Sequence, residues 1–393
     1  AEWSKENVQS MTQTEIEDLL RQGRVAQARA LADDWLSHAP DALLALQYQG
    51  STRLFCGDAI GAEESFRKAL ALSPSLARNR ANLGIALMTQ GRYAEGLPFY
   101  ESRYASDIAA HDRVSFAGLL PQRQWRGEAL AGRRLLLVRE QGYGDQIQFI
   151  RFAPQLRQLG AGRVTAWVTT SLAMLFTGVE GLDAVTEAAP ADTDYDLWCP
   201  LLSLPLLLKL TAPQVPDKLP YLSAPTQRAA EWCDRIDRWA PGKSTLGIVW
   251  AGSPGNSVDA RRSLPIELML KMMEARHGAV AFSLQVGAAG MERLERQCGD
   301  GMIPLLDMLN DFADTAAVIE RLDLVITVDT AVAHLAGALG KQVWLLLPAG
   351  PDWRWGLRGC ATPWYPTMKI FRQPVAGDWA SVVDEVTTML ANR

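Results

Sequence analysis

A carboxylate in a glycine-rich loop is the first feature of this sequence that could do chemistry. The segment RRLLLVREQGYGDQIQF (133–149) starts with an apolar run, passes through Gly142, Tyr143 and Gly144, and presents Asp145 where a helix is expected to begin. A carboxylate near a helix N-terminus is kept ionised, and when partly shielded from water it can act as a general base. The alternative is an aspartate that caps the helix. One side chain can serve both roles.

The same segment also has the order strand, Gly-x-Gly, helix, with which a dinucleotide site begins. However, Ile147 stands where the third glycine of that fingerprint belongs. No acidic residue closes a second strand in the way that ribose binding requires. We therefore set the dinucleotide interpretation aside.

A second candidate site is the segment TVDTAVAHLAGALG (327–340). An apolar run ends before Asp329, which is expected to be the helix N-cap, and Thr330 and Ala331 begin the first turn. Small residues there leave the backbone N–H groups open, and such a helix start binds anions. His334 would add a donor. The alternative is an ordinary capped helix with His334 packed in the core.

A third candidate is the segment WAGSPGNSVDARRSLP (250–265), in which Ser253 lies in a Gly/Pro/Ser/Asn loop that leads to Arg261 and Arg262. Arginine side chains hold phosphate through two parallel hydrogen bonds. Alone, the segment would read as a solvated charged loop. Two loops that favour anions at strand ends of one domain together suit a diphosphate.

The elements that must position these residues alternate along the chain after residue 132. Strand-like apolar runs are followed by helix-like segments, a pattern that predicts parallel sheets with helices on both faces and ligands at the carboxyl ends of the strands. A proline-rich join (211–220) divides the pattern into two halves, which predicts two Rossmann-like domains beside a cleft. The expected strands are 134–138, 164–168, 245–250, 279–286, 323–328 and 342–347.

A repeat precedes this region. Gly23, Gly57 and Gly91 follow one another at intervals of 34 residues, and several other small or apolar positions keep the same interval. Each unit reads as two amphipathic helices with a turn at the glycine, which resembles the tetratricopeptide repeat. Three such repeats would form a curved solenoid with a concave face for a protein or peptide. The alternative is a helical spacer without a ligand.

Composition excludes several partners. The formal net charge of −5 gives no electrostatic reason to expect nucleic acid or an anionic membrane. The five cysteines are scattered and form no C-x-x-C pair, which favours a reducing compartment. The most apolar segment (197–210) is too short to span a bilayer and contains two prolines. We expect a soluble, cytoplasmic protein without a membrane span.

No metal site is expected. The segment ADTDYD (191–196) contains Asp-x-Asp, as metal-dependent sugar transferases do, but it stands in a polar loop outside any strand-to-helix junction. A solvated loop is the better interpretation. No other cluster of histidine, cysteine or carboxylate residues appears in the sequence.

With these segments in view, residues 133–393 resemble a two-domain GT-B glycosyltransferase of the bacterial heptosyltransferase-like type (glycosyltransferase family 9). The resemblance rests mainly on DFADTAAVIERLDLVITVDTAVAHLAGALGKQVWLLLP (311–348), with PDWRW (351–355) after it. The shorter blocks are 135–156, 247–265 and FSLQVG (282–287). Tetratricopeptide repeats joined to such a domain resemble bacterial proteins proposed to glycosylate proteins, flagellin among them.

The resemblance implies roles for particular residues. It makes Asp145 the general base on the acceptor hydroxyl, in an acceptor-side loop with Gly142, Tyr143 and Gly144. The family's basic contact to donor phosphate falls on Arg262, where many lipopolysaccharide heptosyltransferases carry lysine, so the donor need not be ADP-heptose. The other expected donor-binding residues are Ser253, Arg261, Gln285, Val286, Asp329, Thr330, Ala331 and His334.

The resemblance thus implies an inverting, metal-independent glycosyltransferase that uses a nucleotide-sugar and no cofactor. The expected parts are repeats (1–110), a linker (111–132), an acceptor-side domain (133–225) and a nucleotide-sugar-binding domain (226–393). The repeats would hold a protein acceptor. The alternatives are an inactive adaptor with a degenerate transferase domain, and a transferase that acts on lipopolysaccharide or another glycan.

Overall fold

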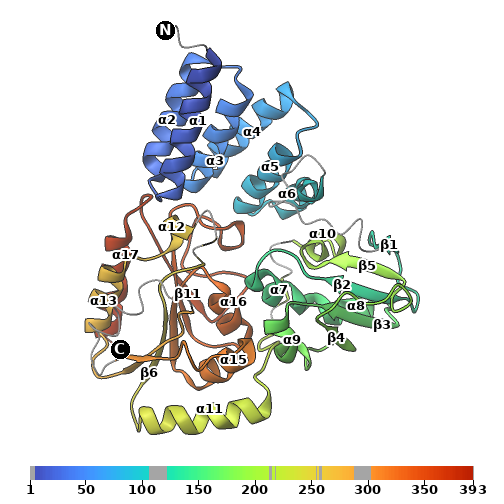
Figure 1. Ribbon diagram of the computed structural model, residues 1–393, viewed down its shortest axis with the longest axis vertical. Helices are drawn as coiled ribbons and strands as arrows, with labels where there is room; N and C mark the ends of the chain where they lie inside the picture. Colours follow the sequence, from blue (N-terminus) through green and yellow to red (C-terminus); the bar gives the residue numbers. More distant parts are fainter. Residues whose placement is uncertain are drawn as a thin grey trace.

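The computed structural model of the chain describes residues 5–105, 122–211, 215–216, 218–253, 255, 259–286 and 302–392. Within these ranges the chain forms a helical array and two α/β bodies, each built on a parallel sheet (Figure 1). The array lies at the top of the view. The first body, with its sheet from β1 to β5, lies at the lower right, and the second lies at the lower left. The predicted parallel-sheet class is confirmed.

The helical array consists of three helix pairs and a terminal 3-10 turn. Gly23, Gly57 and Gly91 turn the chain within the pairs, and their φ values of +73°, +84° and +80° lie in the left-handed region that glycine adopts without strain. The repeat is therefore helical with turns at the expected positions, while its tetratricopeptide identity stays a prediction. The elements are α1 (Lys5–Arg21), α2 (Val25–His38), α3 (Leu43–Phe55), α4 (Ala59–Leu72), α5 (Ala77–Thr89), α6 (Tyr93–Tyr100) and η1 (Glu101–Tyr104).

Helices α5 and α6 pack at a distance that only glycine permits. A Cβ atom on Gly84 would lie 2.7 Å from the Gly96 carbonyl oxygen and 2.7 Å from the Tyr100 backbone nitrogen. Backbone atoms of a packed helix cannot move aside as a flexible side chain can. The small residues of the repeat therefore set the spacing of the helices.

We predict that Gly84→Ala lowers the free energy of unfolding by about 1–3 kcal/mol, because overpacking outweighs the better helix propensity of alanine. Urea unfolding followed by circular dichroism measures this change. Gly178→Ala is the matched control, since a Cβ atom there would meet nothing within 4 Å. Equal stabilities of the two variants would contradict the packing argument.

The first body is built on a five-stranded sheet of order β1-β5-β2-β3-β4, with all pairs parallel. Residues predicted as linker belong to it, because β1 pairs with β5 and Trp125 is fully buried. The elements are β1 (Arg123–Gln124), β2 (Arg134–Val138), α7 (Tyr143–Phe149), η2 (Ile150–Phe152), α8 (Ala153–Gln158), β3 (Arg163–Trp167), α9 (Thr170–Phe176), β4 (Ala184–Thr186), β5 (Leu197–Pro200), η3 (Leu201–Ser203) and α10 (Leu204–Leu207).

The second body is built on a six-stranded parallel sheet of order β11-β10-β9-β6-β7-β8. The chain reverses direction across the sheet between β6 and β9, and ligands of such sheets bind where the strand order reverses. The elements are α11 (Thr226–Trp239), β6 (Thr245–Val249), α12 (Asp259–Arg262), α13 (Ile266–Glu274), β7 (Val280–Ser283), β8 (Met302–Pro304), α15 (Phe312–Arg321), β9 (Leu324–Val328), α16 (Ala331–Ala338), β10 (Val343–Leu347), η6 (Trp353–Trp355), β11 (Met368–Arg372) and α17 (Trp379–Ala391).

The strands of the second sheet are buried on both faces. Along β10, Trp344 and Leu346 pack in the cluster under α13 and α17, whereas Val343, Leu345 and Leu347 belong to the main core on the other face. This alternation follows from the two-residue period of a strand. It explains why the central strands appear in the sequence as continuous apolar runs.

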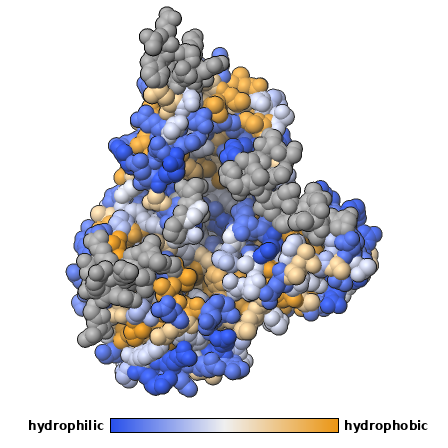
Figure 2. Space-filling view, in the orientation of Figure 1, coloured by the Kyte–Doolittle hydropathy of each residue, from blue (hydrophilic) through white to orange (hydrophobic). Residues whose placement is uncertain are grey.

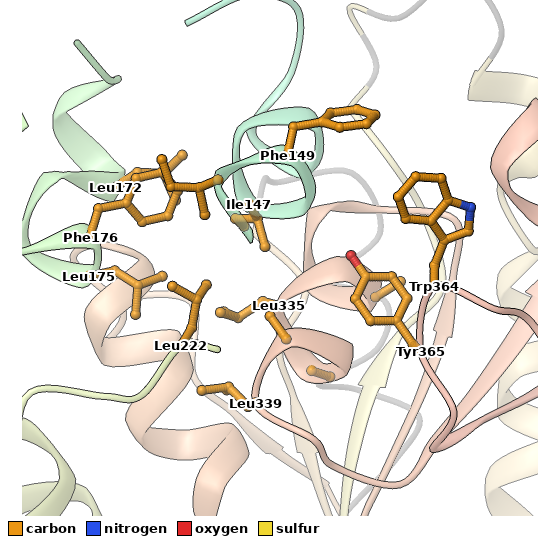
Figure 3. Close-up of a cluster of buried hydrophobic side chains, with 14 of the residues drawn as sticks. Ile147, Phe149, Leu172, Leu175, Phe176, Leu222, Leu335, Leu339, Trp364 and Tyr365 are labelled. Carbon is orange, nitrogen blue, oxygen red and sulfur yellow. The ribbon is translucent and has the colours of Figure 1, made fainter. Parts of the chain in front are cut away.

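One hydrophobic core joins the array and the two bodies. Figure 3 shows Ile147 and Phe149 of α7 among the same buried side chains as Leu335 of α16 and Tyr365, which come from the second body. Tyr93 of the array joins them through Trp353, with ring centroids 5.5 Å apart. The relative positions of the three parts are therefore fixed by packing.

The turns of the array rest on loops of the second body. A Cβ atom on Gly57 would lie 2.7 Å from the Ala349 carbonyl oxygen, and one on Gly350 would lie 2.2 Å from that of Leu54. At Gly23 the neighbour is the Ala260 carbonyl oxygen, at 2.9 Å. The array therefore contacts the loops that follow β6 and β10.

The surface is polar where helices face solvent. Figure 2 shows hydrophilic residues along the lower edge, where Figure 1 places α11, whose Trp232 and Ile236 point into the core. None of the helices in the described ranges has the length and apolar character needed to cross a bilayer. The described cysteines, at positions 56, 199, 233 and 360, are free thiols.

Candidate functional site

A cavity of about 770 Å³ lies between the two bodies. From the first body it is lined by the loop after β2 and by Ser171, and from the second by loops after β6, β7, β9 and β10. All residues predicted as site residues line it, so the fold brings together segments far apart in the sequence. They are Gly142, Tyr143, Gly144, Asp145, Ser253, Arg261, Arg262, Gln285, Val286, Asp329, Thr330, Ala331 and His334.

Asp145 occupies the third position of α7. Gly142 is the N-cap, and its backbone N–H donates a hydrogen bond of 2.9 Å to Asp145 Oδ2. The other carboxylate oxygen forms an ion pair with Arg354 of the second body. Asp145 is therefore not the N-cap, but it does hold the start of the helix while it lines the cavity.

Burial dominates the electrostatics of Asp145. Desolvation raises the pKa of this carboxyl group above its usual value, while the Arg354 cation and the Gly142 N–H oppose the rise. The sequence argument expected the helix N-terminus to keep the group ionised. That expectation missed both the degree of burial and the countercharge from the other body.

Gly144 makes room for His334. A Cβ atom on Gly144 would lie 2.7 Å from His334 Cδ2 and 3.5 Å from the Ala331 Cα atom. The absent side chain thus lets α7 approach α16 closely.

We predict that Gly144→Ala weakens binding of the nucleotide-sugar expected from the sequence about tenfold, since overpacking of about 1–3 kcal/mol would displace the His334 ring. The dissociation constant can be measured by calorimetry. In a His334→Ala background the clash is relieved, so Gly144→Ala should cause little further loss there. An equally large loss in that background would contradict the mechanism.

The start of α16 faces the cavity without a side-chain cap. Thr330, not Asp329, is the N-cap, and its hydroxyl lies 3.2 Å from that of Thr327 instead of capping the helix. The prediction of Asp329 as N-cap is wrong by one residue. The N–H groups of Ala331 and Val332 therefore remain suited to an anionic ligand, while that of Ala333 donates to the Thr330 carbonyl oxygen at 3.1 Å. Burial and the nearby Asp352 carboxylate raise the pKa of Asp329 to about 6.

His334 is a neutral group in this environment. Burial, together with the positive charges of Arg354 and Arg151, lowers its pKa well below the usual value. Its Nδ1 atom lies 3.0 Å from the hydroxyl of Tyr365, and its ring stacks on Trp355 with centroids 5.1 Å apart. His334 is thus packed in the core and also lines the cavity, while its role as a donor to an anion stays a prediction.

The two predicted phosphate-binding arginines differ in their surroundings. Both lie in the short helix α12 and not in an open loop. Arg262 is held by Asp259 at 3.1 Å and faces the cavity with further N–H donors. Arg261 lies over the Phe55 ring at 3.9 Å and donates to the Gly350 carbonyl at 2.7 Å. Burial lowers its pKa to about 10, and these two contacts join the array to the loop after β10.

The residues predicted to lie near the nucleotide also differ. The side-chain oxygen of Gln285 accepts hydrogen bonds from the backbone N–H groups of Trp250 (3.3 Å) and Ala251 (3.0 Å). It thereby ties the ends of β6 and β7 together. Val286 is exposed at the cavity edge, as is Ser253.

The cavity lining also includes residues that the sequence analysis did not predict, among them Asp352, Arg354 and Phe312. Arg354, together with Asp352 at 2.9 Å, lines the cavity in the loop after β10. Phe312 also lines it, and its ring lies 5.0 Å from that of Tyr143 across the gap between the bodies. The sequence signal for Arg354 was a charged residue between Trp353 and Trp355, in the segment that follows the buried strand β10.

The Asp-x-Asp segment lies in a loop away from the cavity, as expected. Asp196 pairs with Arg134 at 2.7 Å, and Asp194 accepts a hydrogen bond from the Ala191 N–H at 3.0 Å. These carboxylates therefore fix the loop that precedes β5.

The fold and the cavity define an α/β protein with a candidate ligand site at the carboxyl ends of two parallel sheets. The segment 276–371, which carries most of the second body's site residues, matches the sequence model of the family Glycosyltransferase family 9 (heptosyltransferase).

A relative of the whole chain is Protein FlbA of Caulobacter vibrioides, which is 28% identical over 94% of this chain. The chain spans 64% of that protein's length. Similar solved structures include a glycosyl transferase of family 9 from Veillonella parvula, with a TM-score of 0.48, 10% identity, and coverage of 68% of this chain and all of that one. Another is the ADP-heptose lipopolysaccharide heptosyltransferase II of E. coli, with a TM-score of 0.45, 12% identity, and coverage of 66% and 99%.

Proposed function

We propose that this protein is an inverting, metal-independent glycosyltransferase of the GT-B type, which transfers a sugar from a nucleotide-sugar to a hydroxyl group. The observation that carries the proposal is the arrangement of one cavity. Asp145 lines it from the first body, and Arg262 and the uncapped start of α16 line it from the second. A general base thus faces an anion site across a space that suits a sugar nucleotide. The family match at 276–371 supports the same reaction class.

In the proposed reaction the acceptor oxygen attacks the anomeric carbon of the donor sugar. The new C–O bond forms as the bond from that carbon to the diphosphate oxygen breaks. Asp145 takes the proton of the acceptor hydroxyl group. The N–H groups of α16, with Arg262 and neutral His334, stabilise the negative charge on the leaving nucleoside diphosphate. Attack from the face opposite the leaving group inverts the configuration.

We assign the leaving-group charge to protein groups and not to a metal ion. The described cavity lining offers Arg262 and helix N–H groups on the side of the second body, and Arg354 beside Asp145. Fixed donors of this kind stabilise developing charge without a cation. EDTA is therefore expected to leave the transfer rate unchanged.

We further propose that the helical array, as a tetratricopeptide solenoid, holds a protein acceptor, with a flagellin-like protein as one candidate. Support comes from the array's position against the loops after β6 and β10, which places it beside the cavity. The free thiols and the absence of a membrane-crossing helix in the described ranges suit a bacterial cytoplasmic enzyme.

The test is a panel of UDP-, GDP-, ADP- and CMP-sugars in thermal-shift and donor-hydrolysis assays, with and without EDTA. A ligand at 100 times its dissociation constant stabilises the folded state by about 2.7 kcal/mol, which is readily measured. The proposal expects one nucleotide class to stabilise the protein and to be hydrolysed. No stabilisation at millimolar concentration would favour an inactive adaptor. Transfer to lipopolysaccharide fragments but not to proteins would redirect the acceptor assignment.

A further inference from the structure

The loop that presents Asp145 has a strained backbone. Gln141 has a φ of +55°, in the left-handed region that residues other than glycine rarely adopt. The next residue, Gly142, donates its N–H to Asp145 Oδ2. If Gln141 relaxed to an ordinary conformation, Gly142 would turn and the carboxylate would shift with it. Something must therefore hold this loop in place.

The residue before Gln141 is held by the end of the helical array. Glu140 has no exposed side-chain surface and accepts hydrogen bonds from Arg103 Nε (3.2 Å) and Nη2 (3.1 Å). The hydroxyl of Tyr104 donates to it at 2.7 Å, and the Leu202 N–H donates at 2.9 Å. Arg103 and Tyr104 belong to η1, so the array anchors the end of β2 in a buried network.

Gln141 itself is bonded to the array. Its Nε2 atom donates a hydrogen bond of 2.8 Å to the hydroxyl oxygen of Tyr100, the last residue of α6. Burial raises the pKa of Tyr100 to about 12, so its hydroxyl group is neutral throughout the working range of an enzyme. The guanidinium of Arg103 lies over the Tyr100 ring at 4.4 Å, which fixes the ring in turn. The contact is therefore a rigid tether.

We propose that the end of the helical array positions the catalytic loop, through Arg103 on Glu140 and Tyr100 on Gln141, so that the array is a working part of the transferase site. Tyr100 and Arg103 are positioning residues, since they act on Asp145 through the loop. The inference rests on the proposed function, in which Asp145 is the general base. It adds that the array cannot be removed as a separable docking module without loss of catalysis.

The test compares Tyr100→Phe, Gln141→Asn and the double variant in the full chain. Tyr100→Phe removes only the accepting oxygen. Asparagine tolerates the left-handed conformation, yet its side chain is one methylene too short for the hydrogen bond. Each single variant is expected to lower kcat about tenfold, because small misplacements of a reacting group are costly. The donor KM and the Tm should stay near the wild-type values, and the double variant should be no slower than either single variant.

Tyr48→Phe is the matched control, since it removes a tyrosine hydroxyl bond, to Glu17, within the array and away from the loop. Its kcat should equal that of the wild type. An unchanged kcat in Tyr100→Phe would overturn the proposal that Tyr100 positions the loop through Gln141. So would a loss of kcat in the double variant equal to the product of the two single losses. Asp145→Asn measured in parallel separates the two proposals. If that variant kept full activity, the proposed mechanism would fail and not the tether alone.

Discussion

Replacing Asp145 with asparagine is expected to lower the kcat of sugar transfer by about 10²- to 10⁴-fold, the usual contribution of a positioned general base. The amide oxygen can still accept the Gly142 N–H, so the start of α7 is kept. Arg354 keeps its ion pair with Asp352 at 2.9 Å. The fold and the donor site should therefore survive while proton removal is lost. Steady-state transfer kinetics and donor binding by calorimetry measure the two effects separately.

Asp194→Asn is the matched control for this substitution. It makes the same chemical change in the Asp-x-Asp loop, where the carboxylate accepts a hydrogen bond from the Ala191 N–H. We expect its kcat to match that of the wild type. Full activity of Asp145→Asn would remove the residue from the mechanism and leave its role at the helix start. Loss of activity in Asp194→Asn would instead point to a site outside the cavity.

Periodicity explains which parts of the fold could be predicted. The strands at 324–328 and 343–347 are buried on both faces, so they appear as short apolar runs bounded by turns. The left-handed turns at Gly23, Gly57 and Gly91 repeat because each helix pair needs the same reversal of the chain. The strands that were not predicted are β1, β4, β5, β8 and β11. Of these, β1 has only two residues and gives no periodic signal, and only its pairing with β5 makes it a strand.

The location of the site followed from topology more than from any single residue. Side chains after the parallel strands β6 and β9 meet at one edge of the sheet, so Arg262 and the start of α16 had to be close. Topology could not predict which partners each of these side chains contacts. Gln285 lines the cavity, yet its amide oxygen is bonded to two backbone N–H groups. The guanidinium of Arg261 packs over the ring of Phe55, which lies in a helix of the array.

The site contacts that the sequence analysis did not predict are contacts between distant parts of the chain. The ion pair of Asp145 and Arg354 joins residues 209 positions apart in different bodies. Gly144 contacts His334 in the same way, across the boundary between α7 and α16. Neither partner carries a local pattern that points to the other. Such pairs depend on how the two bodies pack against each other. The periodicity of strands and helices in the sequence carries no information about that packing.

Arg354→Gln is expected to move the acid limb of the kcat/KM–pH profile to higher pH by about one to three units, the usual effect of losing an adjacent opposite charge. Burial raises the pKa of Asp145, and Arg354 is the largest opposing influence. Without this cation the pKa of Asp145 rises further, because the carboxylates of Asp352 and Glu140 also act to raise it. A general base works in its ionised form, so activity is lost first at low pH and recovers as pH rises.

The measurement is the full pH profile of donor turnover for Arg354→Gln beside Arg358→Gln. Arg358 is exposed in the loop that follows η6, so its replacement changes the net charge equally without touching the cavity. If long-range charge alone set the profile, both variants would shift it alike. A shift confined to Arg354→Gln assigns the effect to the ion pair, and a downward shift would contradict the role of Asp145 as the base. Because Arg354 lies in the second body and Asp145 in the first, that profile also reports whether the two bodies stay in contact during turnover.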